Sequence, residues 1–248
     1  ILATYAFAIQ IYCDFSGYTD IGRGVARMLG IELRLNFRLP YFATSPSDFW
    51  QRWHISLSSW LRDYLYIPLG GNRHGERKMY RNLILTMLLG GLWHGAAWNF
   101  VLWGAYHGLL LILFRAFSQP VAHPELPGDG TPLRRAGAQF WLKAFLFFQL
   151  TCVGWLLFRS PSLGQLNHFV WAIVNNPGWE AITRHDLQLL ALCVLPLLAV
   201  QLPQHFRDDQ EFWTHWPLAA QAAAGVVLYY GIVFLQAPKT YPFIYFQF

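Results

Sequence analysis

Five stretches of the chain carry few or no charged side chains, and this pattern constrains the fold more than any other feature. They cover residues 1–11, 83–114, 140–158, 187–202 and 219–235. A helix needs about 20 mostly apolar residues to cross a bilayer, and shorter stretches suit re-entrant or buried helices. Charged residues make up 12% of the chain, whereas soluble domains carry about 25%. The sequence therefore predicts an all-α protein that crosses a membrane several times.

The basic residues are concentrated in one part of the chain. Residues 14–81 hold ten Lys and Arg against six Asp and Glu, whereas residues 82–248 hold eight against seven. Membrane proteins place Lys and Arg in short cytoplasmic loops, so much of the 23–81 region is expected at the cytoplasmic face. This explains the net charge of +5 without nucleic-acid binding. Membrane lipids are expected as partners, and nucleic acid is not.

One short helix is predicted to begin at Ser45. Ser45 suits the N-cap, Pro46 suits the first helical position, and Asp48 would complete a capping box. A stripe of aromatic and apolar side chains then recurs every three to four residues: Phe49, Trp53, Leu57, Trp60 and Tyr64. Such a helix is too short and too polar to span a bilayer, so we expect it at the interface or buried among other helices.

The segments around this helix are predicted to be connections. Polar residues and Gly17 are expected to interrupt the first apolar run. The expected connections are an amphipathic segment over 21–40 that ends at Pro40, a basic cytoplasmic loop over 73–81, and an extramembrane loop over 118–137. Residues 83–114 form either one bent span or two short ones, and the sequence leaves this open.

Two histidines lie inside the long apolar stretch, His94 before Gly95 and His107 before Gly108. Ionisable groups at membrane depth are costly and tend to line cavities or substrate sites; a hydrogen-bonded packing role is the alternative. Glycine beside His94 would let a ligand approach closely. If residues 94–107 formed one helix, the imidazoles would lie nearly 20 Å apart. They could not then share a site, and one would be catalytic and the other structural.

A third histidine, His54, belongs to the predicted short helix. It could reach His94 only through the tertiary fold, and a polar residue at the interface is the alternative. No metal or bound cofactor is expected, because His94 and His107 match no zinc spacing and the chain contains no nucleotide-binding or serine-nucleophile motif. A partly buried, neutral imidazole is suited to removing a proton from a hydroxyl group near neutral pH.

Three motifs together resemble the membrane-bound O-acyltransferase family. They are YCDFSGYTDI at 12–21, FWQRWHISLS at 49–58 continued by RDY at 62–64, and LWHG at 92–95 continued by WN at 98–99. The segment YIPLGGNR at 66–73 and the ending FIYFQF at 243–248 are similar to the bacterial branch that O-acetylates alginate and related exopolysaccharides.

The resemblance implies a ring of tilted transmembrane helices around a thin central tunnel, with short amphipathic or re-entrant helices. Residues 1–248 would form a single membrane domain, the C-terminal catalytic part of the fold without its N-terminal helices. His94 matches the family's active-site histidine, and His54 matches its second active-site position. The further tunnel candidates are Arg52, Trp53, Asp63, Trp93, Trp98, Asn99 and His107. Arg52 and Asp63 are expected to fix the short helix by ion pairing.

The implied activity is transfer of an acetyl group from acetyl-CoA, or another acetyl thioester, to hydroxyls of an exopolysaccharide such as alginate. The implied location is the bacterial inner membrane, and the implied partners are extracytoplasmic polysaccharide O-acetylation proteins. A transporter-like subunit and a non-catalytic scaffold remain as alternatives.

Overall fold

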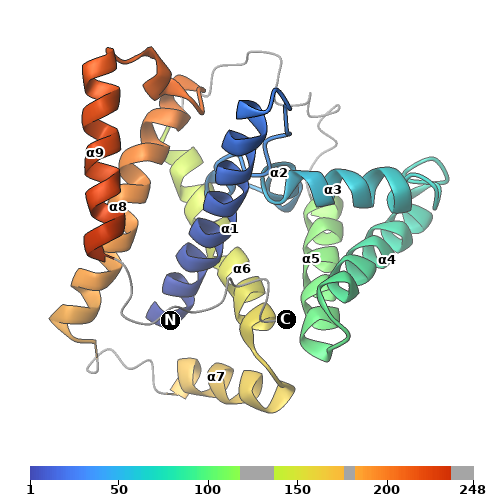
Figure 1. The fold of residues 1–248 in the computed structure, drawn as a ribbon. Helices are drawn as coiled ribbons and strands as arrows, with labels where there is room; N and C mark the ends of the chain where they lie inside the picture. The colour runs from blue at the N-terminus through green and yellow to red at the C-terminus, as the bar shows by residue number, and fades with distance from the viewer. Residues whose placement is uncertain (118–136, 176–181, 236–248) are drawn as a thin grey trace.

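The computed structural model describes residues 1–117, 137–175 and 182–235. Every regular secondary-structure element in these residues is a helix (Figure 1). The long helices are α1 (Leu2–Met28), α4 (Glu76–His94), α5 (Trp98–Phe117), α6 (Ala138–Arg159), α8 (Arg184–Arg207) and α9 (Leu218–Leu235). The shorter elements are η1 (Pro40–Phe42), α2 (Pro46–Arg52), α3 (Ile55–Leu61), η2 (Arg62–Tyr66), α7 (Leu163–Asn175) and η4 (Phe212–His215). The predicted loop 118–137, except Gly137, and the motif at 243–248 lie outside the described residues.

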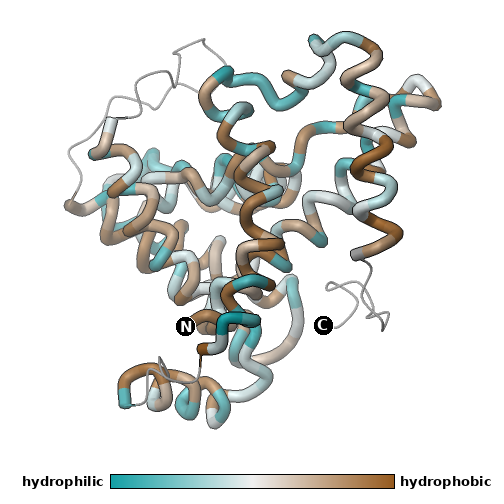
Figure 2. Tube along the Cα trace, turned by 90° about the vertical axis from the view of Figure 1, so that its left-hand side faces the viewer, coloured by the Kyte–Doolittle hydropathy of each residue, from teal (hydrophilic) through white to brown (hydrophobic). Residues whose placement is uncertain are grey.

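Three of these helices, α5, α6 and α8, are long and apolar enough to cross a membrane. Hydrophobic residues recur along the upright helices, and several connections between them are hydrophilic (Figure 2). α8 leaves apolar side chains such as Leu187, Leu192 and Leu195 exposed, which suits contact with lipid tails. The prediction of a helical membrane protein is confirmed for the described part of the chain.

An aromatic core forms where α1, α2, α5 and α6 meet. Phe49 lies in α2, and Trp53 is the C-cap of that helix. Both pack with Trp155 and Phe158 of α6, and all four side chains are almost fully buried. Phe49 and Trp53 stack with their ring centroids 5.7 Å apart, and Trp53 lies 4.7 Å from Trp155. This packing fixes α2 against the long helices and thereby sets the position of His54, which follows Trp53.

The long apolar stretch folds as a helical hairpin, which settles the question that the sequence left open. α4 ends at His94 and α5 begins at Trp98, so the assumption of one helix from 94 to 107 is wrong. Two glycines let the helices touch: a Cβ at Gly91 would collide with the carbonyl of Phe100, and one at Gly104 with the carbonyl of Met87. The predicted loop over 73–81 is also too long, because α4 begins at Glu76.

The predicted helix from Ser45 is broken in two. Ser45 is the N-cap of α2, and its hydroxyl accepts from the Asp48 N–H at 3.2 Å. The Asp48 carboxylate accepts from the N–H of Thr44, so the capping box is shifted by one residue. The helix stops after Arg52, because Trp53 is extended (φ −102°, ψ 128°) and His54 then adopts left-handed backbone angles (φ 44°, ψ 53°).

The N-terminal helix, in contrast, is longer and less interrupted than the sequence predicts. α1 continues through Gly17 and the polar residues around it to Met28, because an exposed helix tolerates them. Residues 31–38 that follow are not helical, and Pro40 begins the turn η1. The extended segment is therefore free to lie along α2 and α3.

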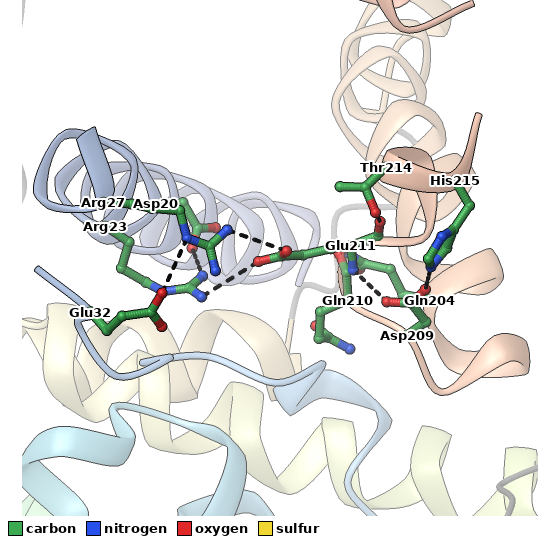
Figure 3. Close-up of polar contacts among 10 residues, drawn as sticks. All are labelled: Asp20, Arg23, Arg27, Glu32, Gln204, Asp209, Gln210, Glu211, Thr214 and His215. Atoms are coloured by element: carbon green, nitrogen blue, oxygen red, sulfur yellow. Dashed lines mark hydrogen bonds and ion pairs between the residues drawn. The ribbon is translucent and has the colours of Figure 1, made fainter. Parts of the chain in front are cut away.

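A group of ion pairs ties the end of α1 to the turn after α8 (Figure 3). The Glu211 carboxylate lies 3.7 Å from the Arg23 guanidinium and 3.4 Å from that of Arg27. Nearby, Arg38 pairs with Asp208 at 2.9 Å. Exposed pairs contribute about 0–1 kcal/mol each, so this network orients the C-terminal helices more than it stabilises the fold.

Candidate active site

His54 lies at the break between α2 and α3, and the extended segment 31–38 holds the break in place. The carbonyl of Asn36 accepts from the Ile55 N–H at 2.9 Å, and the carbonyl of Arg52 accepts from the Arg38 N–H at 2.9 Å. Left-handed angles are unfavourable for a residue other than glycine, asparagine or aspartate, and such strain persists where surrounding contacts enforce it. These two hydrogen bonds supply that enforcement and turn the His54 side chain away from the helix axis of α2.

A side-chain network orients the His54 ring. The Asn36 Oδ1 atom accepts from both the backbone N–H and the hydroxyl of Ser56, at 3.2 and 3.0 Å. The Ser56 hydroxyl oxygen also lies 3.4 Å from His54 Nδ1. Because the serine proton is used on Asn36, this contact favours a proton on Nδ1. His54 Nε2 would then keep its lone pair.

His94 is the last residue of α4, and it is half-buried against aromatic rings from α5 and α6. Its ring centroid lies 5.2 Å from that of Trp103 on α5, 5.2 Å from that of Phe158 on α6 and 6.2 Å from that of Phe100. The glycine after it serves this packing, since a Cβ at Gly95 would collide with the Phe100 ring. The sequence analysis assigned Gly95 to the close approach of a ligand. The contact with Phe100 explains the glycine without a ligand.

The two histidines meet at Trp93. The Trp93 ring centroid lies 6.1 Å from that of His54 and 5.0 Å from that of His94, with both imidazoles edge-on to the indole. An open pocket of about 340 Å³ lies on the His54 side of this group, lined by His54, Ser56, Leu57, Trp60 and Trp93. The arrangement places a titratable ring at the pocket wall and a second one behind Trp93.

His107 is nearer to this group than one continuous helix would allow. Its ring centroid lies 5.0 Å from that of Trp103, the same indole that His94 contacts. It is fully buried and stacks on Phe49 at 6.0 Å. His107 thus belongs to the aromatic packing behind His94, and it does not line the pocket beside His54.

The remaining predicted residues are spread over different environments. Arg52 is buried and pairs with Asp48, and Asp63 is exposed and pairs with its neighbour Arg62 at 2.7 Å. Trp53 is part of the aromatic core, whereas Trp98 is 71% exposed. Asn99 is buried and donates to the Phe158 carbonyl at 3.1 Å. Of the predicted tunnel residues, only Trp93 lines the pocket with His54.

Sequence reasoning missed several residues around the histidines: Ser56 and Trp103 contact them, and Asn36 holds Ser56. Asn36 lies in the segment predicted to be amphipathic, and nothing in its surroundings points to His54. Trp103 sits between His94 and His107 in the chain, and its role depends on the hairpin. Ser56, two residues after His54, could have been found by its spacing. Among the described residues, no group of three His, Cys, Asp or Glu side chains could hold a metal ion.

The profile of the membrane-bound O-acyltransferase family matches residues 1–157, which include His54, His94 and His107. The chain belongs to the membrane-bound O-acyltransferase family. A probable alginate O-acetylase AlgI of Pseudomonas putida (strain KT2440) is 36% identical to it, over 100% of this chain and 53% of the relative. Another probable alginate O-acetylase AlgI, of Azotobacter vinelandii, is 46% identical over 79% of this chain and 37% of the relative.

The family members that resemble this chain include enzymes with a different named acceptor. A peptidoglycan O-acetyltransferase of Helicobacter pylori (strain 26695) is 43% identical over 65% of this chain and 29% of its own length. This chain therefore spans about half, or less, of the length of these relatives. The residues matched by the family profile, 1–157, contain the histidine pair and its pocket.

Proposed function

We propose that the chain carries the catalytic part of a membrane O-acyltransferase, with His94 as the catalytic base and His54 as its partner. The observation that carries the proposal is the meeting of the two imidazoles on Trp93. They come from separate helices, and a polar network fixes one of them. Packing alone would not require an oriented, polar ring at a pocket wall, since an apolar side chain would pack there without the cost of burying polar atoms.

The proposed reaction moves an acetyl group from a thioester to a hydroxyl. The His94 imidazole accepts the hydroxyl proton while the oxygen attacks the thioester carbonyl. The C–O bond forms, the C–S bond then breaks, and the imidazolium returns its proton to the leaving thiolate. A positioned base of this kind typically accelerates a reaction by about 10²- to 10⁴-fold. No metal or bound cofactor takes part, and the donor is acetyl-CoA or another acetyl thioester.

His54 orients a reactant in this scheme instead of exchanging protons. Burial lowers the pKa of His54 to about 4, so it stays neutral at physiological pH. With Nδ1 directed to Ser56, the Nε2 atom is available to accept a hydrogen bond from the incoming hydroxyl. A neutral acceptor at this atom can hold that hydroxyl in place for attack.

The donor is proposed to arrive from the face that carries the arginines of Figure 3. A second pocket of about 300 Å³ opens there, and Arg23, Arg27, Tyr12 and Phe37 are among its lining residues. Phe37 packs on Phe15 at 5.0 Å, and Phe15 packs on His54 at 4.7 Å. Two aromatic rings, those of Phe37 and Phe15, therefore lie between this pocket and His54.

The acceptor and the setting follow from the relatives. Alginate is the proposed acceptor, because probable alginate O-acetylases match most of the chain. The proposed location is the bacterial inner membrane, with the acetyl group passed toward extracytoplasmic proteins that place it on the polysaccharide.

The test is the acetyl content of the secreted polysaccharide in cells whose full-length protein carries His94→Ala. Membrane abundance must match the wild type, and His168→Ala, an exposed histidine on α7, serves as the control. We expect acetylation to fall to background with His94→Ala and to stay normal with His168→Ala. Near-normal acetylation with His94→Ala would contradict the proposal and favour a scaffold. Loss with both variants would show that the assay reports general damage.

A further inference from the structure

The helix α7 (Leu163–Asn175) separates its apolar and polar residues onto two faces. Leu166, Val170, Ile173 and Val174 fall on one side at helical spacing, Gln165, His168 and Asn175 fall on the other, and Asn167 lies between Val174 and Trp171 at the border. Ser162 begins the helix, with its hydroxyl accepting from the Gln165 N–H at 3.2 Å. Residues 163–175 contain no charged side chain. Such a helix needs an apolar surface on one side and water on the other.

The described protein does not supply that apolar surface. α7 buries none of its own side chains, and Val174 remains 73% exposed on the apolar side. The helix lies at one end of the molecule, and it runs across the direction of the upright helices in both views (Figures 1 and 2). It follows α6 after three residues, and the next described helix, α8, is also a candidate span. α7 is thus placed at the level where two spans leave the membrane.

We propose that α7 lies in the interface of the lipid bilayer, with its apolar face in the acyl-chain boundary. α8, the next described helix, likewise leaves the apolar side chains of Leu187, Leu192 and Leu195 exposed. Trp171 stands at the border of the two faces and is 60% exposed, which is the position that tryptophan favours at a membrane surface. Because α7 has no charged side chain, the apolar face alone anchors it. Zwitterionic lipid, which has no net charge, is therefore sufficient for α7 to bind the bilayer.

The same geometry assigns α7 to the extracytoplasmic leaflet. The opposite end of the molecule carries the end of α1 and the segment after it, with Arg23, Arg27, Arg34 and Arg38, and also the end of α8 at Arg207. At the α7 end, the described helix termini contribute Arg159 and Arg184. Basic residues favour the cytoplasmic side of short loops, so the α7 end faces outward.

Fluorescence quenching in the full-length protein tests the lipid contact. A fluorescent amino acid is placed at Val174, on the apolar face, or at Gln165, on the polar face, and the protein is reconstituted in phosphatidylcholine vesicles. We expect a nitroxide lipid labelled near the headgroup to quench the Val174 probe several-fold more than the Gln165 probe, and aqueous iodide to show the reverse order. Strong iodide quenching at both sites would overturn the proposal, because α7 would then project into water. Protection at both sites would overturn it equally, because protein would then cover the helix.

Oriented membrane vesicles test the assigned leaflet with the Gln165 probe. External iodide is expected to quench it in right-side-out vesicles and to leave it unquenched in inside-out vesicles. The opposite result would place α7 at the cytoplasmic face and contradict the assignment. Adding phosphatidylglycerol should leave the Val174 quenching unchanged, and a requirement for this anionic lipid would contradict anchoring by the apolar face alone.

Discussion

His54 and His94 approach the same indole ring, that of Trp93, from two different helices. His54 comes from the break between α2 and α3, whereas His94 ends α4. Their ring centroids lie 6.1 and 5.0 Å from that of Trp93. The relation between the two histidines therefore depends on Trp93 and on the backbone break that turns His54 toward it.

Removing the shared ring should uncouple the pair. We expect Trp93→Ala to lower acetylation by about 10- to 100-fold, because misplacing a catalytic group by an ångström can cost this much. Trp93→Phe keeps an aromatic ring and should retain more activity. Trp98→Ala is the matched control, since Trp98 is exposed and contributes to neither described pocket. Equal loss with Trp93→Ala and Trp98→Ala would argue against a specific role for Trp93.

The polar network at His54 should behave as a unit. Asn36→Ala removes the acceptor of two hydrogen bonds from Ser56 and should destabilise the protein by about 1–3 kcal/mol. Ser56→Ala should cost less, because it removes only the hydroxyl. We expect the double variant to be less destabilised than the sum of the two single variants. Thermal unfolding of the detergent-solubilised protein measures all three, and strict additivity would show that the network does not couple them.

The helical hairpin should be intolerant of a single added methyl group. A Cβ at Gly104 would collide with the Met87 carbonyl, whereas one at Gly17 of α1 would meet no atom within 4 Å. Gly104→Ala is expected to cost about 1–3 kcal/mol or more, because the atoms that the added Cβ would meet belong to the backbone of α4 and cannot turn aside. Gly17→Ala should be neutral or stabilising by a few tenths of a kcal/mol to about 1 kcal/mol. The measurement is the unfolding temperature of each variant, which should be lower for Gly104→Ala than for Gly17→Ala. Similar values would contradict the close crossing of α4 and α5.

The sequence was sufficient for the helical class, for three helices with the length and composition of membrane spans, and for naming His54 and His94 as candidates. Apolar length determines spans directly, and local motifs mark His54 and His94. It was not sufficient for the break at His54, because that break depends on hydrogen bonds to the Asn36 carbonyl and from the Arg38 N–H, and both residues lie in a segment with no periodic pattern. It also could not place His107, since the hairpin between α4 and α5 depends on contacts of Gly91 and Gly104 across helices.

Acid should destabilise the protein partly through His54. Its pKa in the fold is about 4, below the ordinary 6.5, so the unfolded chain binds the proton first. Stability contributed by the neutral ring is complete above about pH 6.5 and is lost as the pH falls toward 4. We expect the unfolding temperature to drop more between pH 7 and pH 5 in the wild type than in His54→Asn. The exposed-site variant His168→Asn should follow the wild type, and identical drops in all three proteins would contradict this assignment.

The most direct test of the central claim replaces the proposed base with a side chain that can form hydrogen bonds but cannot accept the hydroxyl proton. That variant is His94→Gln in the full-length protein, and the measurement is the acetyl content of the polysaccharide at matched membrane abundance. Proton transfer by His94 predicts acetylation at background level, as with His94→Ala. Substantial acetylation by His94→Gln would contradict it, because hydrogen bonding along a pathway, as in a transporter-like subunit, would then be enough.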